Sequence, residues 1–298
     1  MKKIIVPALA LLFGTLTACG EPSEPTYFSD GGFMLPSSHA NVLKSFGFFS
    51  EVEPGVAYGF DLDGVVSDGT SPDSCYESDY TDPDGRTGID NQLAKIWTDL
   101  DPLVGDATRG LLQGSINEGR FLLMIELENL DDYMNDDDVT LHLFRGRLKP
   151  EIGTFGFIAP DQTIYFDDTF SSARVPGLKV VDGVLEAGPI AFQIPVDILE
   201  ARFTMQVHSG KIRINIRDDG SFHGYIGGFV TIQDVLDELY ATDAVQEAML
   251  VTPFFENNAD RNPVNGRCTD FSTTFHFEGT TAHVVRYPSI NNIPKVGN

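Results

Sequence analysis

The sequence predicts a mainly β protein: an antiparallel β-sandwich-like domain with small helical hairpins at about 88–118 and 231–252. In the segments RFLLMIELENL and STTFHFEGTTAHVVRY, and in much of the chain between them, apolar and polar residues alternate with a period of two. This alternation is typical of strands with one buried face. A Ser-Gly pair at 209–210 and an Asp-Gly pair at 219–220 mark tight turns, so the strands that flank them are expected to run antiparallel.

The first helical stretch, 88–118, is expected to hold two short helices. Asp90 or Asn91 is in position to cap the first helix, and Asp106 the second, because such side chains accept hydrogen bonds from the free N–H groups of a first turn. Gly119 is expected to end the second helix. The apolar residues of the first helix share one face: Ile89, Leu93, Ile96, Trp97 and Leu100.

The second helical stretch, 231–252, begins with the sequence TIQD. A threonine followed three residues later by an acid is the pattern of a capping box. We expect one helix from this point to Tyr240 and a second over 244–250. The β-rich segments and both helical stretches are expected to form a single globular domain over 33–298.

The N-terminus has the layout of an export signal. Two lysines precede an apolar run, 4–16, that is too short to span a bilayer comfortably. The sequence LTAC that ends at Cys19 resembles the lipobox of bacterial lipoproteins, in which the cysteine is acylated and becomes the mature N-terminus. The resemblance implies a signal peptide at 1–18 and, because Gly20 rather than aspartate follows, an outer-membrane location. The alternative is an ordinary cleaved signal with an incidental cysteine.

The segment 19–32 is rich in Pro, Ser, Glu and Gly and is expected to be a flexible tether. Removing the two lysines of the signal leaves 18 basic against 44 acidic residues, a net charge of −26. This charge argues against nucleic acid as a partner and against electrostatic binding to anionic lipid. Contact with the membrane is therefore expected through the lipid anchor only.

Two cysteines remain once Cys19 is assigned to lipid, namely Cys75 and Cys268. An exported protein folds in an oxidising compartment, where an even remainder indicates one disulfide. That bond would join an acid-rich segment to the C-terminal part of the chain. Two free thiols are the alternative.

The segment 61–91 is dense in aspartate, with Arg86 as its only basic residue. Calcium prefers several carboxylate and carbonyl oxygens on a flexible loop, and converging carboxylates repel one another unless a cation or solvent screens them. Neither Gly64 nor Gly85 gives the spacing of an EF-hand. The alternative is a set of turns and a helix cap with solvated acids. The residues expected to bind one calcium ion are Asp61, Asp63, Asp82, Asp84 and Asp90.

Several motifs occur along the chain in an order that other proteins share. In these motifs the chain resembles uncharacterised predicted secreted proteins and lipoproteins of myxobacteria and their relatives. The motifs are FDLDG, DYTDPDGRTGIDNQLA, LLMIELENLDD, LEAGP, DGSFHGYIGG and GRC. The similarity covers most of residues 57–280. It supports the pairing of Cys75 with Cys268, assigns no catalytic residue and implies no established activity.

Three functions remain open from the sequence. The first is a binding or scaffolding domain with structural calcium, whose partner is a protein, a glycan or a hydrophobic ligand. The second is a polysaccharide hydrolase that uses carboxylates such as Glu126 and Glu128, which share one face of a strand. The third is a carrier of lipid or another hydrophobic ligand, suggested by the 22 phenylalanines. The sequence has no GxSxG, Walker or Rossmann motif, which favours a role other than catalysis.

Overall fold

The structure is a computed structural model that describes residues 25–28, 31–35, 38–198 and 201–287. The expected signal peptide and Cys19 lie outside these residues. Strands are the dominant element, and they are accompanied in the described chain by three α-helices and one short 3-10 helix. The mainly β class is therefore confirmed.

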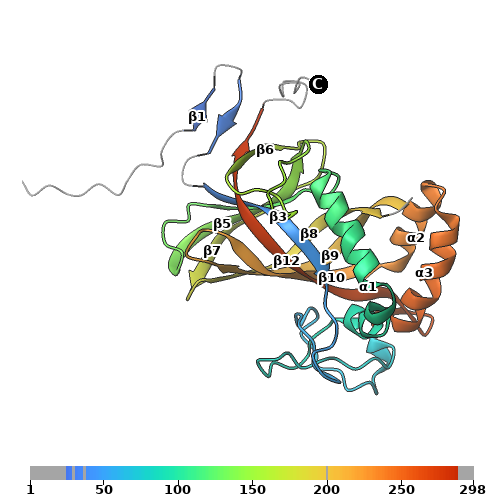
Figure 1. Cartoon of the computed structure of the whole chain (residues 1–298). Helices are drawn as coiled ribbons and strands as arrows, with labels where there is room; N and C mark the ends of the chain where they lie inside the picture. The colour runs from blue at the N-terminus through green and yellow to red at the C-terminus, as the bar shows by residue number, and fades with distance from the viewer. Residues whose placement is uncertain (1–24, 29–30, 36–37, 199–200, 288–298) are drawn as a thin grey trace, which may run out of the picture.

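Eight strands form one antiparallel sheet that closes on itself into a barrel (Figure 1). The order around the ring is β12, β3, β4, β5, β7, β8, β9 and β10, and β10 pairs again with β12. This closed sheet replaces the expected two-layer sandwich. Both architectures give strands with a period of two, and the long-range pairing of β10 with β12 distinguishes them. The strands are β3 (Ser38–Phe48), β4 (Leu123–Glu128), β5 (Asn135–Arg147), β7 (Ala173–Val181), β8 (Val184–Ile198), β9 (Ala201–Ile216), β10 (Phe222–Thr231) and β12 (Arg267–Val285).

Two short strands extend the barrel sheet. β6 (Gln162–Phe166) pairs in parallel with the end of β12 and antiparallel with β5, and β11 (Arg261–Val264) forms a hairpin with the start of β12. A separate hairpin of β1 (Thr26–Tyr27) and β2 (Phe33–Met34) lies at the N-terminal end (Figure 1). This hairpin falls partly within 19–32, the segment expected to be a tether.

Aliphatic and aromatic side chains fill the barrel interior, because alternate residues of each strand point into the ring. Asn41 is a buried polar residue among them. Its Nδ2 donates to Gly220 O at 2.9 Å, and its Oδ1 accepts from Phe222 N at 2.8 Å. Both ends of the amide are thus hydrogen-bonded, as a buried polar group requires. Other buried side chains on this face are Ile125, Leu141, Leu143, Leu185, Ile212, Ile214, Ile226 and Phe277.

The two glycine pairs expected as turns differ in the structure. The pair at 219–220 is a turn between β9 and β10, in which Gly220 N donates to Arg217 O at 2.9 Å. The pair at 209–210 lies inside β9, where the register shifts against both β8 and β10. Ser209 has a φ of 50° there. The predicted turn at 209–210 is therefore wrong: these residues form a bulge, which bends a long strand around the barrel.

Helix α1 (Gln92–Asn117) is one continuous helix of 26 residues, not the two short helices expected. It runs through Pro102, although a proline inside a helix costs about 3 kcal/mol. Both halves offset that cost by burial, since Trp97 is buried in the first half and Ile116 in the second. Asp106 lies inside the helix and does not cap one.

The N-cap of α1 is Asn91, but its side chain makes no capping hydrogen bond. Its Nδ2 donates instead to Tyr58 O at 2.7 Å, so this side chain ties the preceding loop to the start of the helix. Helix α1 packs on β3 and β12 and also contacts β8, which lies across the ring from β3. The helix therefore lies over one end of the barrel.

The helical hairpin expected at 231–252 is confirmed as α2 (Ile232–Ala241) and α3 (Val245–Asn258), which pack on each other. Thr231 is the N-cap of α2, but its side chain makes no capping bond. The capping-box pattern thus locates the start of the helix without forming the predicted contact. Within the residues that the structure describes, no helix is both long enough and apolar enough to cross a membrane.

Candidate cation-binding site

The loop segment 49–91, between β3 and α1, carries the acid-rich part of the chain. It contains one 3-10 turn, η1 (Pro72–Ser74), and isolated bridges, and it lies at one end of the molecule (Figure 1). Several of its side chains contact Tyr225 of β10, among them Phe60 and Arg86. The Phe60 ring centroid is 4.9 Å from that of Tyr225, and Arg86 Nη2 donates to Tyr225 Oη at 3.0 Å. These contacts hold the loop on the outer surface of the barrel.

Three of the expected calcium ligands meet in this loop segment. One carboxylate oxygen from each of Asp61, Asp63 and Asp90 lies within 4.8 Å of the other two. Asp90 is 5% exposed, whereas Asp61 and Asp63 are half-buried. A backbone bridge between Phe60 and Asp90 brings the two ends of the acid-rich segment together.

Backbone N–H groups position one oxygen of each carboxylate. The donors lie two or three residues after Asp61 and Asp63, as in the Asx-turns that aspartate favours. The donor to Asp90 is Leu62 N, which lies next to the backbone bridge between Phe60 and Asp90. The hydrogen bonds are Gly64 N to Asp61 Oδ1 at 2.6 Å, Val65 N to Asp63 Oδ1 at 2.8 Å and Leu62 N to Asp90 Oδ2 at 2.6 Å.

The second oxygen of each carboxylate differs in its surroundings. Asp63 Oδ2 forms an ion pair with Arg261 of β11. Asp61 Oδ2 and Asp90 Oδ1 accept no hydrogen bond from the part of the chain that the structure describes. Two carboxylate oxygens in the group are therefore available to a ligand.

Asp82 and Asp84, the other two expected ligands, lie outside this group. Asp82 is 3% exposed, and its carboxylate closes its own turn. Its Oδ1 accepts from Asp84 N at 3.0 Å and from Arg86 N at 2.7 Å, and its Oδ2 pairs with the Arg86 guanidinium. Asp84 is exposed. The structure thus brings together three of the five expected ligands.

Asp79 and Asp260 line the same cavity as Asp90. Asp79 accepts a hydrogen bond from Ser67 N at 2.5 Å. Asp260, between α3 and β11, accepts from Ser272 N at 2.9 Å. The density of acids in the loop pointed to Asp79. Asp260 is far away in the sequence from this loop. Only its position shortly before Cys268, the expected disulfide partner of Cys75, could have indicated that it lies near the acidic segment.

Burial and mutual repulsion raise the pKa values of these carboxyl groups. Burial, together with the charges of Asp63, Asp260 and Asp79, raises the pKa of Asp90 to about 8, against one backbone hydrogen bond that lowers it. Burial also raises the pKa of Asp260 to about 7 despite its hydrogen bonds from Ser272. The pKa of Asp79 is raised by the same cause. The site thus has too little positive charge to keep all its carboxylates ionised at low cost.

A cavity of about 590 Å³ opens beside the carboxylates. Seven aspartates line it, against the basic side chains of Arg261 and His208. So acidic a wall disfavours anions and favours a cation or a positively charged ligand. The seven are Asp63, Asp68, Asp73, Asp79, Asp90, Asp260 and Asp270.

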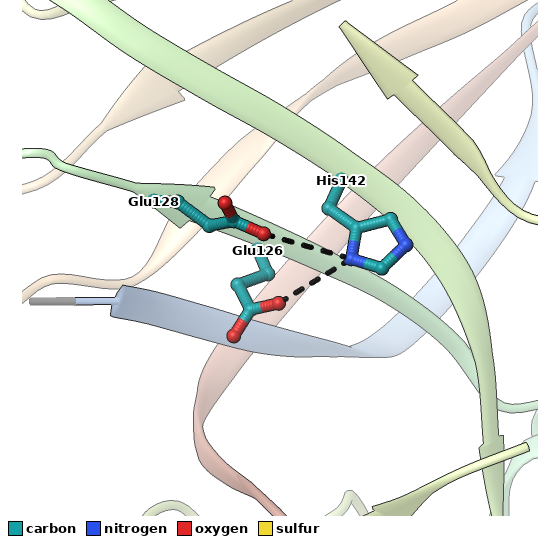
Figure 2. Close-up of side chains that lie close together, drawn as sticks. All are labelled: Glu126, Glu128 and His142. Atoms are coloured by element: carbon teal, nitrogen blue, oxygen red, sulfur yellow. Dashed lines mark ion pairs between the residues drawn. The ribbon is translucent and has the colours of Figure 1, made fainter. Parts of the chain in front are cut away.

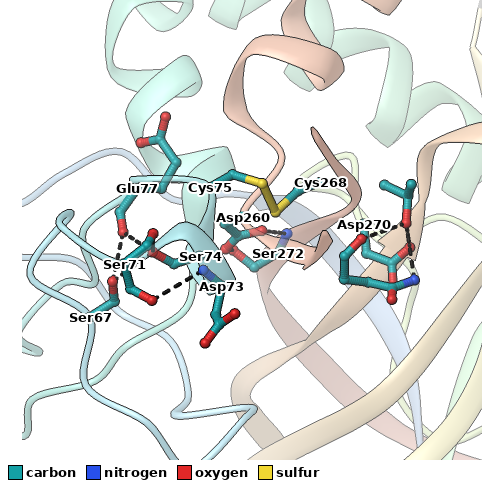
Figure 3. The surroundings of a disulfide bond; sticks show 12 residues. Ser67, Ser71, Asp73, Ser74, Cys75, Glu77, Asp260, Cys268, Asp270 and Ser272 are labelled. Carbon is teal, nitrogen blue, oxygen red and sulfur yellow. Dashed lines mark hydrogen bonds between the residues drawn. A yellow bond between two sulfur atoms is a disulfide. The ribbon is translucent and has the colours of Figure 1, made fainter. Parts of the chain in front are cut away.

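The predicted disulfide between Cys75 and Cys268 is present, with Cα atoms 5.9 Å apart (Figure 3). Cys75 directly follows η1, and Cys268 lies in β12. Figure 3 shows Asp260 and Ser272 beside the bond, with a hydrogen bond from Ser272 to Asp260. The disulfide therefore holds the acidic loop next to the β11–β12 hairpin.

Glu126 and Glu128, the carboxylates considered above for hydrolysis, form a second group with His142 (Figure 2). His142 Nδ1 lies 3.6 Å from Glu126 Oε2 and 3.9 Å from Glu128 Oε1. Arg286 donates to both oxygens of Glu126, and Arg174 to both oxygens of Glu128. This second group is therefore a balanced network of ion pairs.

The pKa of Glu126 is consistent with a structural role. Burial acts to raise it, but contact with His142 and the charge and hydrogen bonds of Arg286 bring it below its ordinary value. A glycosidase acid needs the opposite shift, because it must hold a proton near neutral pH. Glu126 is therefore an ionised partner of Arg286 rather than a proton donor.

No family model, curated protein or solved structure matches the chain. Function is therefore inferred from the geometry of the two groups of acids. In the group of Asp61, Asp63 and Asp90, which lies beside a cavity, two carboxylate oxygens accept no hydrogen bond within the described ranges, whereas arginines hold the carboxylates of Glu126 and Glu128.

Proposed function

We propose that the protein is an outer-membrane lipoprotein, anchored through acylated Cys19, whose β-rich body binds calcium through Asp61, Asp63 and Asp90. The calcium would order the acidic loop and form part of a surface that binds a partner at the adjoining cavity. The observation that carries this proposal is the carboxylate of Asp90, which is 5% exposed and lines the cavity beside two further carboxylates; one of its oxygens accepts no hydrogen bond from the described residues.

The charge balance of the group favours a bound cation. Arg261 pairs with Asp63, whereas Lys211 donates to the backbone oxygen of Asp61 and not to its carboxylate. Asp61 and Asp90 have no ion-pair partner among the residues that the structure describes. Carboxylates at this spacing repel one another, and a divalent cation would offset that repulsion.

Calcium fits the group better than magnesium or zinc. The three oxygens lie within 4.8 Å of one another, and calcium accepts several oxygen ligands in a flexible geometry. Magnesium demands near-ideal octahedral geometry and keeps several of its waters, so it suits a group of protein carboxylates less well. Zinc prefers histidine and cysteine, and the three ligands are all carboxylates. Backbone carbonyls and water would complete the coordination of calcium.

The N-terminal sequence supports the membrane anchor. Several acyl chains on one cysteine give stable membrane attachment, since each buried CH₂ contributes about 0.8 kcal/mol. The net charge of −26 that remains after removal of the signal gives the body no attraction to anionic lipid. Attachment would therefore depend on acylation of Cys19.

The two alternative functions have less support from the geometry. Arg286 and Arg174 hold the carboxylates of Glu126 and Glu128, which a hydrolase would need to expose to substrate. The barrel interior, where a carrier would hold an apolar ligand, is packed with buried side chains. The acidic cavity favours a cationic partner over a lipid.

Calcium binding to the purified Cys19→Ser protein, which avoids the need for detergent, tests the cation site. We expect about one calcium ion per chain by equilibrium dialysis, retained in the presence of excess magnesium at constant ionic strength. Binding of calcium no tighter than that of magnesium would contradict the proposal, because screening of an acidic surface does not discriminate between the two ions.

A further inference from the structure

We propose that the β1–β2 hairpin is a second membrane contact, in which Tyr27 and Phe28 lie in the lipid headgroup region beside the acylated cysteine. This inference rests on the proposed anchoring through Cys19. The hairpin pairs Thr26 with Met34 and Tyr27 with Phe33. Its side chains at the tip leave much apolar surface in water, because Tyr27 is 72% exposed and Phe28 is 40% exposed.

The hairpin is an ordered element rather than a loose tether. Phe28 N donates to Gly32 O at 2.8 Å, and Gly31 N donates to Phe28 O at 3.0 Å. The rings of Tyr27 and Phe33 lie 5.8 Å apart, so the aromatic side chains of the two strands support each other. An exposed aromatic surface on an ordered hairpin is typical of a contact site.

The body of the protein fixes the direction in which the hairpin projects. Phe33 forms two backbone hydrogen bonds of 2.8 Å with Arg286, which directly follows β12. Gly32 lies so close to Tyr287 that a Cβ at this position would be 2.8 Å from the Tyr287 ring. Figure 1 shows the hairpin extending away from the barrel as a result. The hairpin therefore reaches beyond the acidic body.

The position of the anchor places this hairpin near the bilayer. Pro25, the first described residue, is only six positions after Cys19, a stretch that spans at most roughly 20 Å when extended. The segment 25–34 contains a single charged residue, Asp30, in a chain with a strong excess of acids. Anionic headgroups therefore repel the body more than the hairpin, and tyrosine is enriched at membrane–water interfaces.

Tryptophan fluorescence in the acylated full chain tests this contact. The variant Tyr27→Trp is reconstituted into vesicles of phosphatidylethanolamine and phosphatidylglycerol, with and without brominated acyl chains. Tyr240→Trp is the matched control, because Tyr240 is an aromatic residue on α2 that is 48% exposed. The native Trp97 is 7% exposed and gives the same background in both variants. We expect brominated lipid to quench the tryptophan at position 27 and to leave the one at position 240 unchanged.

The outcomes separate this contact from the anchor itself. If the acylated protein floats with the vesicles but the tryptophan at position 27 is not quenched, the anchor stands and the hairpin contact is overturned. If the acylated protein does not float, anchoring through Cys19 fails first. If the emission of the tryptophan at position 27 shifts to the blue without vesicles, in proportion to protein concentration, the hairpin contacts a second copy of the chain, which also overturns the inference.

Discussion

Cys75 and Cys268 are joined by a disulfide although they are 193 positions apart in the sequence. The bond connects a loop with little regular structure to the start of barrel strand β12, and it does so beside Asp260. Asp61, Asp63 and Asp79 belong to that loop, whereas Asp260 and Arg261 belong to the chain next to Cys268. The geometry of the acidic site is thus linked to the redox state of one bond.

Removing the disulfide should lower the stability of the protein. For the Cys75→Ser/Cys268→Ser double variant we expect a loss of about 3–5 kcal/mol in the free energy of unfolding, because a long closed loop restricts the unfolded chain. Urea denaturation with and without reductant measures the loss. Reductant should destabilise the wild type and have no effect on the double variant, and an equal effect on both would contradict the prediction.

Replacing single aspartates should separate true ligands from neighbours. Asp61→Asn keeps an oxygen that can accept from Gly64 N but removes the charge, whereas Asp84→Asn changes an exposed acid outside the group. Calcium at a hundredfold excess over Kd should stabilise the wild type and Asp84→Asn by about 2.7 kcal/mol. Thermal melting in calcium and in chelator should show that Asp61→Asn loses most of this gain. Loss of the gain in Asp84→Asn would instead support the five-residue set of ligands.

The stability of the calcium-free protein should fall as the pH rises from about 4 to about 7. The pKa of Asp260 is about 7 in the folded protein, against an ordinary value of 3.8, so in this range the folded state binds more protons than the unfolded state. The stabilisation is complete below pH 4 and is lost as Asp260 ionises, with a slope of up to about 1.4 kcal/mol per pH unit.

Asp260→Asn is the control for this pH dependence, because it keeps an oxygen that can accept from Ser272 N. Urea denaturation in chelator across pH 4.5–7.5 should give a flatter profile for Asp260→Asn than for the wild type. Identical slopes would show that Asp260 is not the group responsible.

The two glutamates of the ion-pair network should differ in their contribution to stability. Glu126→Gln leaves the buried guanidinium of Arg286 without its charged partner, which should cost about 3–5 kcal/mol. Glu128→Gln should cost about 0–1 kcal/mol, because its partner Arg174 is largely exposed. Chemical denaturation of both variants checks this order, and equal costs would contradict it.

Replacing the lipobox cysteine should release the protein from the membrane. Cys19→Ser removes the thiol that would carry acyl chains, so the protein should move to the aqueous fraction and incorporate no radiolabelled palmitate. Cell fractionation and metabolic labelling measure both effects. Continued labelling of the variant would place the acyl chains on another residue.

The sequence by itself determined the elements that depend on local patterns. Alternation of apolar and polar residues identified strands such as β4 and β12, since adjacent side chains of a strand face opposite sides. Helical spacing identified α2 and α3. The even number of remaining cysteines predicted the bond between Cys75 and Cys268, because pairing by count in an oxidising compartment needs no knowledge of the fold.

Only the tertiary structure decided how these elements meet. A strand has the same period in a sandwich and in a barrel, so the closing contact between β10 and β12 could not be predicted locally. Pro102 lies within a continuous α1 because burial of both halves of the helix outweighs its local cost. The Ser-Gly pair at 209–210 forms a bulge and not a turn because β8 and β10 pair with β9 on both sides of it, so the strand continues through these residues.

In the acidic site, too, some features follow from the sequence and others only from the tertiary structure. The sequence determined that aspartates are dense between 61 and 91, but the partner of each carboxylate depends on contacts between distant segments. Asp82 is held by Arg86 within its own turn, whereas Asp90 joins Asp61 and Asp63 through the bridge to Phe60. Asp260 reaches the same cavity from the far end of the chain. Electrostatic energy depends on distance in space, and the fold alone sets that distance.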